Sequence, residues 1–585
     1  MIGSLPPFSN TPPPSLLFFF PMTSLKLDSS FWWLMAGYGA LLIGVSLYFT
    51  KMIKNSDDFY GSNGRTSFWF SGLSFFMTAF SASVFVANAS ITYRHGALNA
   101  LLVVAQAPIF ITGYFLFSAR WRRSGCATVV EFIRRRFGAP TAKFFMWVGI
   151  PVRVLESSNR LYVTAVLFEV LLGISLFTGA TVTAVVTLLS TVGGGFLAVV
   201  VTDAVQAILL TLIVAVVAVL SWQAVGGWEN FAANVPADYW SLATDETGFG
   251  VPLITAWVVV ALFAWNGNWS LVQRFVSVPR ERDARRVSVI SGISYYLLFP
   301  MIAIPAMAAV VLVPGLDTPQ KAEYAYIMVA QQVLPSGLMA ILCFGLLGAT
   351  ITAVNADLNV MAQVVVSDML KKKLISATER RRLFLGRVIM VVVSAVCLVL
   401  AMRIRDFGGA FQFLVMVLGM TTLPTFMPLL FGLLWPHGGG RAAMSAFAAG
   451  IIASLVMKFG CGATLALVIL GNGAVTAIVY FGTGYILRRS AAEEASVAAL
   501  FARIRGRPDE HDEPATAGSD AQGRAVARVA AVTLILCGVL AAFAELATDA
   551  ASPGRGMGAI VAGAMFVVGG GVFYLNRKRK LKPAI

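Results

Sequence analysis

Polar side chains that interrupt long apolar segments are the residues of this chain whose types and spacing suggest chemistry. One of them is Asp203, which follows Thr202 and a run of three glycines at 193–195 in an apolar stretch. A carboxylate in such surroundings can bind a cation or a proton. It can also be part of the N-cap of a helix that begins at this pair. The sequence leaves both interpretations open, and they are compatible.

A second group lies at 349–359, an oxygen-rich stretch inside a long apolar segment. Thr352, Asn355 and Asn359 follow helical spacing and are expected to share one face of a helix. Hydroxyl and amide groups often hold helices together in membranes. A bare alkali cation instead needs several hard oxygen ligands, and these side chains could supply part of such a set.

A third group consists of Arg153, Glu156 and Arg160, at positions i, i+3 and i+7 of another apolar segment. On a helix these side chains face one side and can pair with one another. One interpretation is an internal ion-pair network that locks helices together. The alternative is that an arginine left partly unpaired meets an anionic group of a substrate, since guanidinium matches the fork of a carboxylate.

The composition indicates which solvent surrounds these segments. The 585 residues are 58% hydrophobic and 12% charged, whereas soluble proteins carry roughly 25% charged residues. Apolar runs recur that are long enough to cross a bilayer, which takes about 20 residues per helix. We therefore expect an all-α integral membrane protein in contact with the lipid bilayer. The net charge of +16 comes from short basic clusters between apolar runs, a pattern typical of cytoplasmic loops and not of a nucleic-acid surface.

About fifteen spans are expected, and the distribution of charge orients them. With the N-terminus outside and the C-terminus cytoplasmic, the long basic loops fall inside and the acidic loop 224–252 falls outside, as expected for a multi-pass protein of the inner or plasma membrane. The predicted spans are 31–52, 67–93, 98–119, 141–173, 178–195, 200–223, 253–278, 287–314, 333–368, 382–404, 408–435, 440–458, 462–487, 525–547 and 556–576.

Two blocks of five spans each open with a helix whose middle is interrupted by small and polar residues. The interruptions lie at 81–90 in the first block and at Asn266, Gly267 and Asn268 in the second. A broken helix frees backbone carbonyls and amides, which an ion, a substrate or water must satisfy inside a membrane. Paired broken helices in two halves indicate a binding site near the midplane.

Other functions find little support in the sequence. The five cysteines and three histidines are scattered singly, so no disulfide framework, metal centre or Ser-His-Asp arrangement is indicated. We therefore expect no enzyme activity and no organic cofactor. Gln273 and Arg274, followed by the basic loop 280–286, are interpreted as an anchor at the inner surface.

Five segments, in the same order and spacing, resemble the sodium/solute symporter family, the relatives of the sodium-glucose and sodium-proline symporters. They lie at 57–65, 80–96, 194–206, 273–275 and 418–435, and the resemblance covers roughly 31–487. It implies a LeuT-like fold with a 5+5 inverted-repeat core, one preceding helix and about four following helices. It also implies alternating access, with a sodium ion as the coupling ion.

The resemblance implies two cation sites in this chain. The main sodium site of the family falls on Met77, Phe80, Ala349, Thr352 and Ala353, where Ala353 lacks a hydroxyl that the family uses. Losing one ligand of five is expected to weaken sodium binding. A second site falls on Asp203, Thr352, Asn355 and Ala356. Sodium or a proton is expected to bind between Asp203, Thr352 and Asn355.

The sugar-binding positions of the family fall on residues that offer few hydrogen bonds, namely Ala79, Ser83, Val84, Ala261 and Tyr296. A sugar needs many such partners. The candidate cavity is aromatic and sparsely polar, which favours a small solute such as a monocarboxylate or an amino acid. The residues expected to line the substrate site are Phe80, Ser83, Gln106, Trp265, Tyr295, Tyr296 and Phe413.

Together these patterns predict a secondary active transporter that couples a sodium-type cation to symport of a small organic solute. The alternatives are a proton-coupled or uncoupled carrier, and a transport-like membrane sensor that acts with a partner. The predicted parts are a disordered tail (1–30), a peripheral helix (31–52), the core (53–435, with repeats at about 67–223 and 253–435), two accessory helices (436–487), a cytoplasmic linker (488–524), two C-terminal helices (525–576) and a basic tail (577–585).

Overall fold

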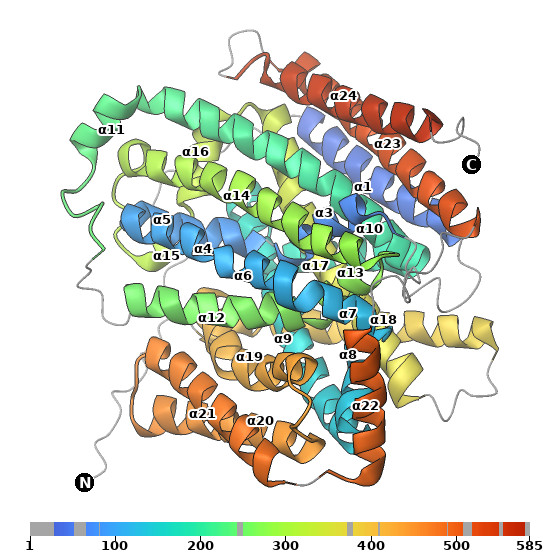
Figure 1. The fold of residues 1–585 in the computed structure, drawn as a ribbon. Helices are drawn as coiled ribbons and strands as arrows, with labels where there is room; N and C mark the ends of the chain where they lie inside the picture. The colour runs from blue at the N-terminus through green and yellow to red at the C-terminus, as the bar shows by residue number, and fades with distance from the viewer. Residues whose placement is uncertain are drawn as a thin grey trace.

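The computed structural model describes residues 29–51, 66–80, 82–242, 250–370, 378–407, 410–487, 489–506, 517–548 and 554–578. The described parts of the chain are helical, and their helices run mostly along one common direction (Figure 1). Residues 1–28 of the tail predicted at 1–30 and the whole of the family-like stretch at 57–65 lie outside the described residues, while Ser29 and Ser30 begin α1.

The helices, in chain order, are α1 (Ser29–Thr50), α3 (Phe68–Ala79), α4 (Ala82–Arg94), α5 (Gly96–Ala105), α6 (Ala107–Thr112), α7 (Ser118–Ser124), α8 (Val129–Phe137), α9 (Ala139–Leu172), α10 (Leu176–Val225), α11 (Trp228–Asn234), α12 (Val251–Gly267), α13 (Trp269–Val276), α14 (Glu281–Leu312), α15 (Pro319–Ala322), α16 (Ala325–Val333), α17 (Ser336–Val364), α18 (Glu379–Ala401), α19 (Ala410–Leu434), α20 (Gly440–Leu455), α21 (Leu465–Ile486), α22 (Ala491–Arg505), α23 (Ala517–Leu546) and α24 (Met557–Lys578).

Length and composition identify the helices that cross the membrane. Within the described residues, 11 helices qualify, or up to 13 when each of two bent helix pairs is taken as one span. The protein is a multi-pass membrane protein as predicted, but the expected number of fifteen spans is not confirmed. The predicted span 178–195 falls on a shorter apolar stretch, Leu176–Thr191, and the predicted span 141–173 falls on α9, which does not qualify.

The two bent pairs are the broken helices predicted from the sequence. The first pair, α3 with α4, bends by 61°, and the second, α12 with α13, bends by 50°. Around them α17 forms the centre of the molecule, since its apolar stretch is completely buried. The central helix is packed by α1, α9 and α10.

Two helix pairs flank this core on opposite sides. In Figure 1, α23 and α24 lie beside α1 on one flank, and α20 and α21 lie beside α19 on the other. Each pair consists of two helices that pack mainly on each other. α23 also packs on α1, α10 and α17, whereas α20 and α21 pack mainly on α19. These positions agree with accessory helices that support the core and do not form its centre.

The segment predicted as a cytoplasmic linker contains a docked helix, α22. It runs crosswise at one end of the bundle (Figure 1) and packs Leu500 and Ile504 against α7 and α8. Ser490 caps its first turn in a reciprocal arrangement with Glu493, which satisfies two amides that would otherwise lack partners. At its other end Arg123 donates to the carbonyl of Ile504 at 3.0 Å.

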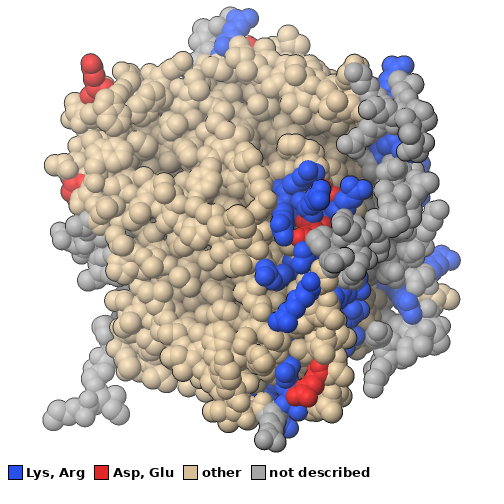
Figure 2. Space-filling view, viewed as in Figure 1, with Lys and Arg blue, Asp and Glu red and all other residues tan. Residues whose placement is uncertain are grey.

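Basic side chains mark this end of the molecule. Figure 2 shows Lys and Arg side chains gathered on the side where α7, α8 and α22 lie. Arg122, Arg135 and Arg286 belong to the helix ends on this side. An excess of Lys and Arg on one side is the feature by which cytoplasmic surfaces of membrane proteins are recognised.

Candidate functional site

The broken helices meet the central helix where their backbones leave helical geometry. α3 ends at Phe80, whose backbone is extended, and α12 ends at Asn268, which is extended as well. The Asn268 side chain accepts a hydrogen bond from the Ser270 amide at 2.9 Å and so caps α13. Carbonyls in the last turn of a helix lack a helical partner and can serve as ligands, although that of Asn266 in α12 accepts a hydrogen bond from Trp121 Nε1 at 2.9 Å.

Asp203 lies deep inside α10 and next to the end of α3. Its side chain is 0% exposed. Ser74 of α3 donates to its Oδ2 at 2.5 Å, whereas its Oδ1 has no hydrogen-bond partner among the described residues. The position in mid-helix shows that the N-cap interpretation of Asp203 was wrong. A buried carboxylate with an unmatched oxygen is costly unless a cation or proton meets it.

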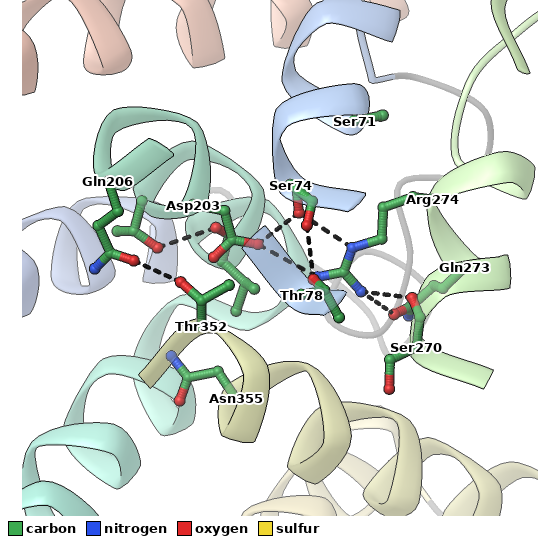
Figure 3. A network of polar contacts seen from close by, with 12 residues as sticks. Ser71, Ser74, Thr78, Asp203, Gln206, Ser270, Gln273, Arg274, Thr352 and Asn355 are labelled. Atoms are coloured by element: carbon green, nitrogen blue, oxygen red, sulfur yellow. Dashed lines mark hydrogen bonds and ion pairs between the residues drawn. The ribbon is translucent and has the colours of Figure 1, made fainter. Parts of the chain in front are cut away.

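Arg274 is the positive partner of Asp203, and it is also 0% exposed. Its Nη2 lies 3.4 Å from Asp203 Oδ2, and its Nε donates to Ser74 Oγ at 3.1 Å. The expectation that Arg274 anchors the chain at the inner surface was therefore wrong. Figure 3 shows Arg274 reaching from α13 toward Asp203, with Ser74 between them.

On the other side of Asp203 lie the polar residues of α17. Thr352 donates to Gln206 Oε1 at 2.5 Å, and the amide nitrogen of Gln206 has no partner in the described part of the chain. Asn355 accepts a hydrogen bond from Thr191 and donates to Ser190 Oγ at 2.9 Å. The helix-holding interpretation is thus confirmed for Asn355, while Figure 3 shows the Thr352 hydroxyl bonded to Gln206 on the side of α17 that faces Asp203.

The remaining residues predicted for the main sodium site are buried at the contact of α3 with α17. Met77 and Phe80 lie at the end of α3, and Ala349 and Ala353 lie on α17. The side chain of Ala353 supplies no oxygen there. The assignment of these residues as cation ligands stays a prediction.

A second buried aspartate, Asp357, completes the charge network of α9. Arg153 lies 3.4 Å from both Asp357 Oδ1 and Glu156 Oε2, and Arg160 pairs with Asp357 Oδ2 and lies 4.0 Å from Glu156. Ser270 of α13 donates to Asp357 Oδ1 at 2.5 Å. The internal network predicted for α9 is confirmed, and Asp357 is a member that sequence reasoning missed.

The short helix α13 links the two aspartates. Ser270 binds Asp357 and Arg274 binds Asp203, and these α13 residues are one helical turn apart, with Arg274 Nη1 donating to the Ser270 carbonyl at 2.8 Å. A shift of α13 therefore changes both contacts at once. The half-helix of the second broken pair is thus mechanically coupled to α10 and α17.

A cavity of about 240 Å³ lies beside these contacts. Its walls come from α3, α4, α5, α9, α12, α14 and α19, and they are mostly apolar and aromatic. Thr78 lines the cavity and donates to the carbonyl of Ser74, the residue that binds Asp203. One helical turn of α3 therefore separates the cavity from Asp203.

The structure brings some of the predicted substrate residues to this cavity and not others. Gln106, Trp265 and Tyr295 line it. Phe80 and Phe413 lie outside the lining, although Phe80 packs edge-to-face on Phe299, which does line the cavity.

Tyr296 also lies outside the lining. Its ring is partly exposed, and its hydroxyl donates to the carbonyl of Val104 at 3.2 Å. The side chain of Ser83 lies outside the described atoms. Sequence reasoning missed Trp257 and Asn159 as lining residues; Asn159 could have been found because it lies between Glu156 and Arg160 on the same face of α9.

Among the described residues, no group of three or more His, Cys, Asp or Glu side chains is arranged to hold a metal ion. The oxygens around Asp203 are hydroxyls, amides, carbonyls and a single carboxylate. That set suits a hard monovalent cation better than a transition metal, which prefers imidazole or thiolate ligands.

Known proteins match this chain in sequence and in fold. Residues 59–450 match the sodium:solute symporter family. A sodium/glucose cotransporter of Vibrio parahaemolyticus is 23% identical over 459 residues, which cover 72% of this chain and 84% of the relative. Sodium/glucose cotransporter 4 of Danio rerio is 22% identical over 397 residues, which cover 61% of this chain and 59% of the relative.

A solved structure has a similar fold. A Na⁺-coupled sialic acid symporter, in a substrate-bound outward-open state, matches with a TM-score of 0.70 over 79% of this chain and 98% of its own, at 16% sequence identity. The LeuT-like fold predicted from the sequence is confirmed, while the predicted number of helices is not.

Proposed function

Because the chain belongs to the sodium:solute symporter family, we propose that it is a secondary active transporter that couples sodium influx to uptake of a small organic solute by alternating access. One charge moving down the membrane potential supplies about 2.3 kcal/mol per 100 mV. That energy is enough to concentrate a neutral solute tens-fold.

The observation that carries this proposal is the unmatched oxygen of Asp203. The carboxylate is fully buried, yet Oδ1 has no partner in the described part of the chain. Thr352 and Gln206 contribute further oxygens on the same side (Figure 3). A sodium ion held by Asp203 Oδ1 and the Thr352 hydroxyl would satisfy that carboxylate. The Asn355 amide oxygen would join them only after releasing its hydrogen bond from Thr191.

The main site of the family is the second part of the proposal. It would use carbonyls of Met77, Phe80 and Ala349 together with the Thr352 hydroxyl. Ala353 leaves this set one oxygen short, so sodium should bind there with lower affinity. The missing oxygen ligand also favours a second candidate function, that of a carrier that couples to protons through Asp203.

Alternating access requires one side of the solute cavity to close while the other opens. The cavity begins at Thr78 and Asn268, where the two helix pairs are broken. It extends to Ile91 and Leu253, toward the helix ends that lie away from the gathered basic side chains. On the opposite side, α3 and α13 are tied by Thr66, Ser71 and Ser277, whose hydroxyls lie within 3.2 Å of one another. These contacts support an outward-facing state with a closed inner gate.

The Lys and Arg side chains gathered on one side of the molecule in Figure 2 support an orientation in the membrane. We place it at the cytoplasm, in the inner or plasma membrane, so that α22 and the C-terminus are cytoplasmic and the N-terminus is outside. In this orientation the cavity faces the compartment from which the solute is taken up.

The test is binding of sodium to the purified protein, measured as a shift of the thermal unfolding midpoint in sodium chloride against potassium and choline chloride. A saturable shift at millimolar sodium, lost in Asp203→Ala and in Thr352→Ala, is the expected result. A pH effect without a sodium effect, abolished in Asp203→Asn, would favour proton coupling. No response to either ion would favour an uncoupled carrier or a membrane sensor.

A further inference from the structure

The cavity wall presents one negative and one positive side chain next to each other. Glu156 and Arg160 lie one turn apart on α9, and both line the cavity. Arg153 and Asp357, the other members of their network, do not line it. The titratable residues of the wall are otherwise limited to Tyr295, within the described residues. A solute therefore meets a fixed dipole with no net charge.

The two wall charges are less completely bound than the charges behind them. Asp357 accepts hydrogen bonds from the side chains of Arg153, Ser157, Arg160 and Ser270. Glu156 is held by ion pairs alone, with its Oε2 at 3.4 Å from Arg153 and 4.0 Å from Arg160. Carboxylates accept up to about four hydrogen bonds, so Glu156 retains acceptor capacity toward the cavity.

Arg160 likewise retains donors. A guanidinium has five N–H groups, and the short contact to Asp357 uses Nη1. Its side chain is 16% exposed, compared with 2% for Arg153. Since Arg160 lines a cavity, the exposed part of its guanidinium faces the space that a solute would fill.

An independent observation lies between these two residues. Asn159 lines the cavity and is 1% exposed, yet neither its amide nitrogen nor its amide oxygen has a hydrogen-bond partner among the described residues. A buried amide without partners costs about 1–3 kcal/mol per unmatched group. A bound solute with both a donor and an acceptor would satisfy it.

The rest of the cavity suits an apolar body of limited size. Trp257, Trp265, Tyr295 and Phe299 line it, and its volume of about 240 Å³ lies below the range of roughly 300–1,000 Å³ found for sites that bind drug-sized molecules. Aromatic rings bind apolar groups and cations alike. The charged groups of the wall lie on α9, whereas Thr78, Asn88, Gln106 and Asn268 add uncharged polar groups elsewhere. The solute should therefore carry its charges at one end.

We propose that the solute is a zwitterion of amino-acid type with an apolar side chain. Its ammonium group contacts Glu156, its carboxylate contacts Arg160, and Asn159 binds the same end. This inference rests on the proposed transport function, and it narrows the class of solute that the symporter carries. A solute with one charge would interact with only one of the two wall charges and gain less electrostatic complementarity.

The experiment compares three matched ligands on the full-length protein in sodium chloride: L-phenylalanine, 3-phenylpropionate and 2-phenylethylamine. The aliphatic series L-leucine, 4-methylpentanoate and 3-methylbutylamine repeats the comparison. Binding is measured by calorimetry and by the shift of the unfolding midpoint. The expected result is saturable binding of at least one amino acid, with the carboxylate and amine analogues at least about tenfold weaker, since hydrogen bonds to charged groups contribute about 1.5–3 kcal/mol.

Two variants locate the effect. Glu156→Gln should reduce the preference for the amino acid over its carboxylate analogue at least threefold. Glu169→Gln makes the same change near the other end of α9, outside the cavity lining, and should leave that preference unchanged. If Glu156→Gln does not fold, the comparison of ligands on the unaltered protein still decides the question.

The outcomes separate this inference from the proposed function. Equal binding of the amino acid and either analogue would overturn the inference, and so would a clear sodium shift with no binding of any of the six ligands. Amino-acid binding that is independent of sodium would support the inference and contradict sodium coupling.

Discussion

Asp203 and Asp357 are the same residue type in the same kind of surroundings, but their contacts differ. Each is buried in the middle of the molecule and each faces an arginine. Asp357 has both oxygens occupied by donors from α9 and α13. Asp203 has one oxygen occupied and one without a partner in the described structure. The difference indicates that Asp357 holds helices together, whereas Asp203 is prepared to accept a further positive charge.

The largest effect should come from removing the fully bound carboxylate. Asp357→Ala leaves Arg153 and Arg160 with Glu156 alone, and breaking a buried pair in this way costs about 3–5 kcal/mol. We expect a clearly lower unfolding midpoint in detergent, equal in sodium and in choline. Asp357→Asn keeps the shape and removes only the charge, so it should lower the midpoint less than Asp357→Ala. A midpoint like that of the unaltered protein would show that the network does not hold α9 to α17.

Removing the arginine beside Asp203 and removing an arginine beside Asp357 should both destabilise the protein, but sodium should restore stability only in the first case. Arg274→Met leaves Asp203 without its resident cation, at a cost of about 3 kcal/mol in choline. Sodium should restore part of that stability, so the sodium-dependent shift should exceed that of the unaltered protein. Arg153→Met is the matched control, and sodium should not rescue it. Equal rescue of both variants would remove the distinction between the clusters.

Neutralising the two aspartates should separate ion binding from folding. Asp203→Asn should weaken sodium binding about tenfold or more, or about 1.4 kcal/mol, and should also lower the midpoint in choline because Arg274 then lies buried without a counter-charge. Asp357→Asn should lower the midpoint and leave sodium affinity unchanged. Sodium titrations followed by thermal unfolding measure both quantities. Unchanged sodium affinity in Asp203→Asn would locate the ion elsewhere.

The smallest effect should be a gain. Ala353→Ser returns the hydroxyl that the family uses at this position, and one added oxygen ligand should tighten sodium binding several-fold, or about 0.5–1 kcal/mol. Ala362→Ser adds the same group at another buried position of α17 and should have no such effect. The same sodium titration tests both, and a gain in Ala362→Ser alone would contradict the predicted site.

The sequence predicted the parts of this arrangement that depend on local pattern. The broken helices, the paired charges of α9 and the cavity residues Gln106, Trp265 and Tyr295 follow from polar residues at particular positions in apolar segments. The resemblance of five segments predicted the fold. Local patterns were sufficient here because a membrane tolerates few polar groups, so each one is informative.

The contacts that distinguish the two aspartates could not be predicted in the same way. Arg274 looked like a surface anchor because basic residues follow it directly, and its partner lies 71 positions earlier in the chain. Asp357 lies in a stretch already recognised as polar, but its pairing with α9 depends on how the helices cross. Likewise α22 has the composition of a linker and becomes ordered through its contacts with α7 and α8.

The packing of α17 at the centre of the molecule has a consequence for how the protein is made. Its polar residues Thr350, Thr352, Asn355 and Asp357 contact side chains of α9, α10 and α13. All of these helices precede α17 in the chain, so the ribosome has synthesised every such partner before α17 emerges. Because synthesis runs from the N-terminus, this fully buried helix enters a membrane in which its hydrogen-bond partners are already present.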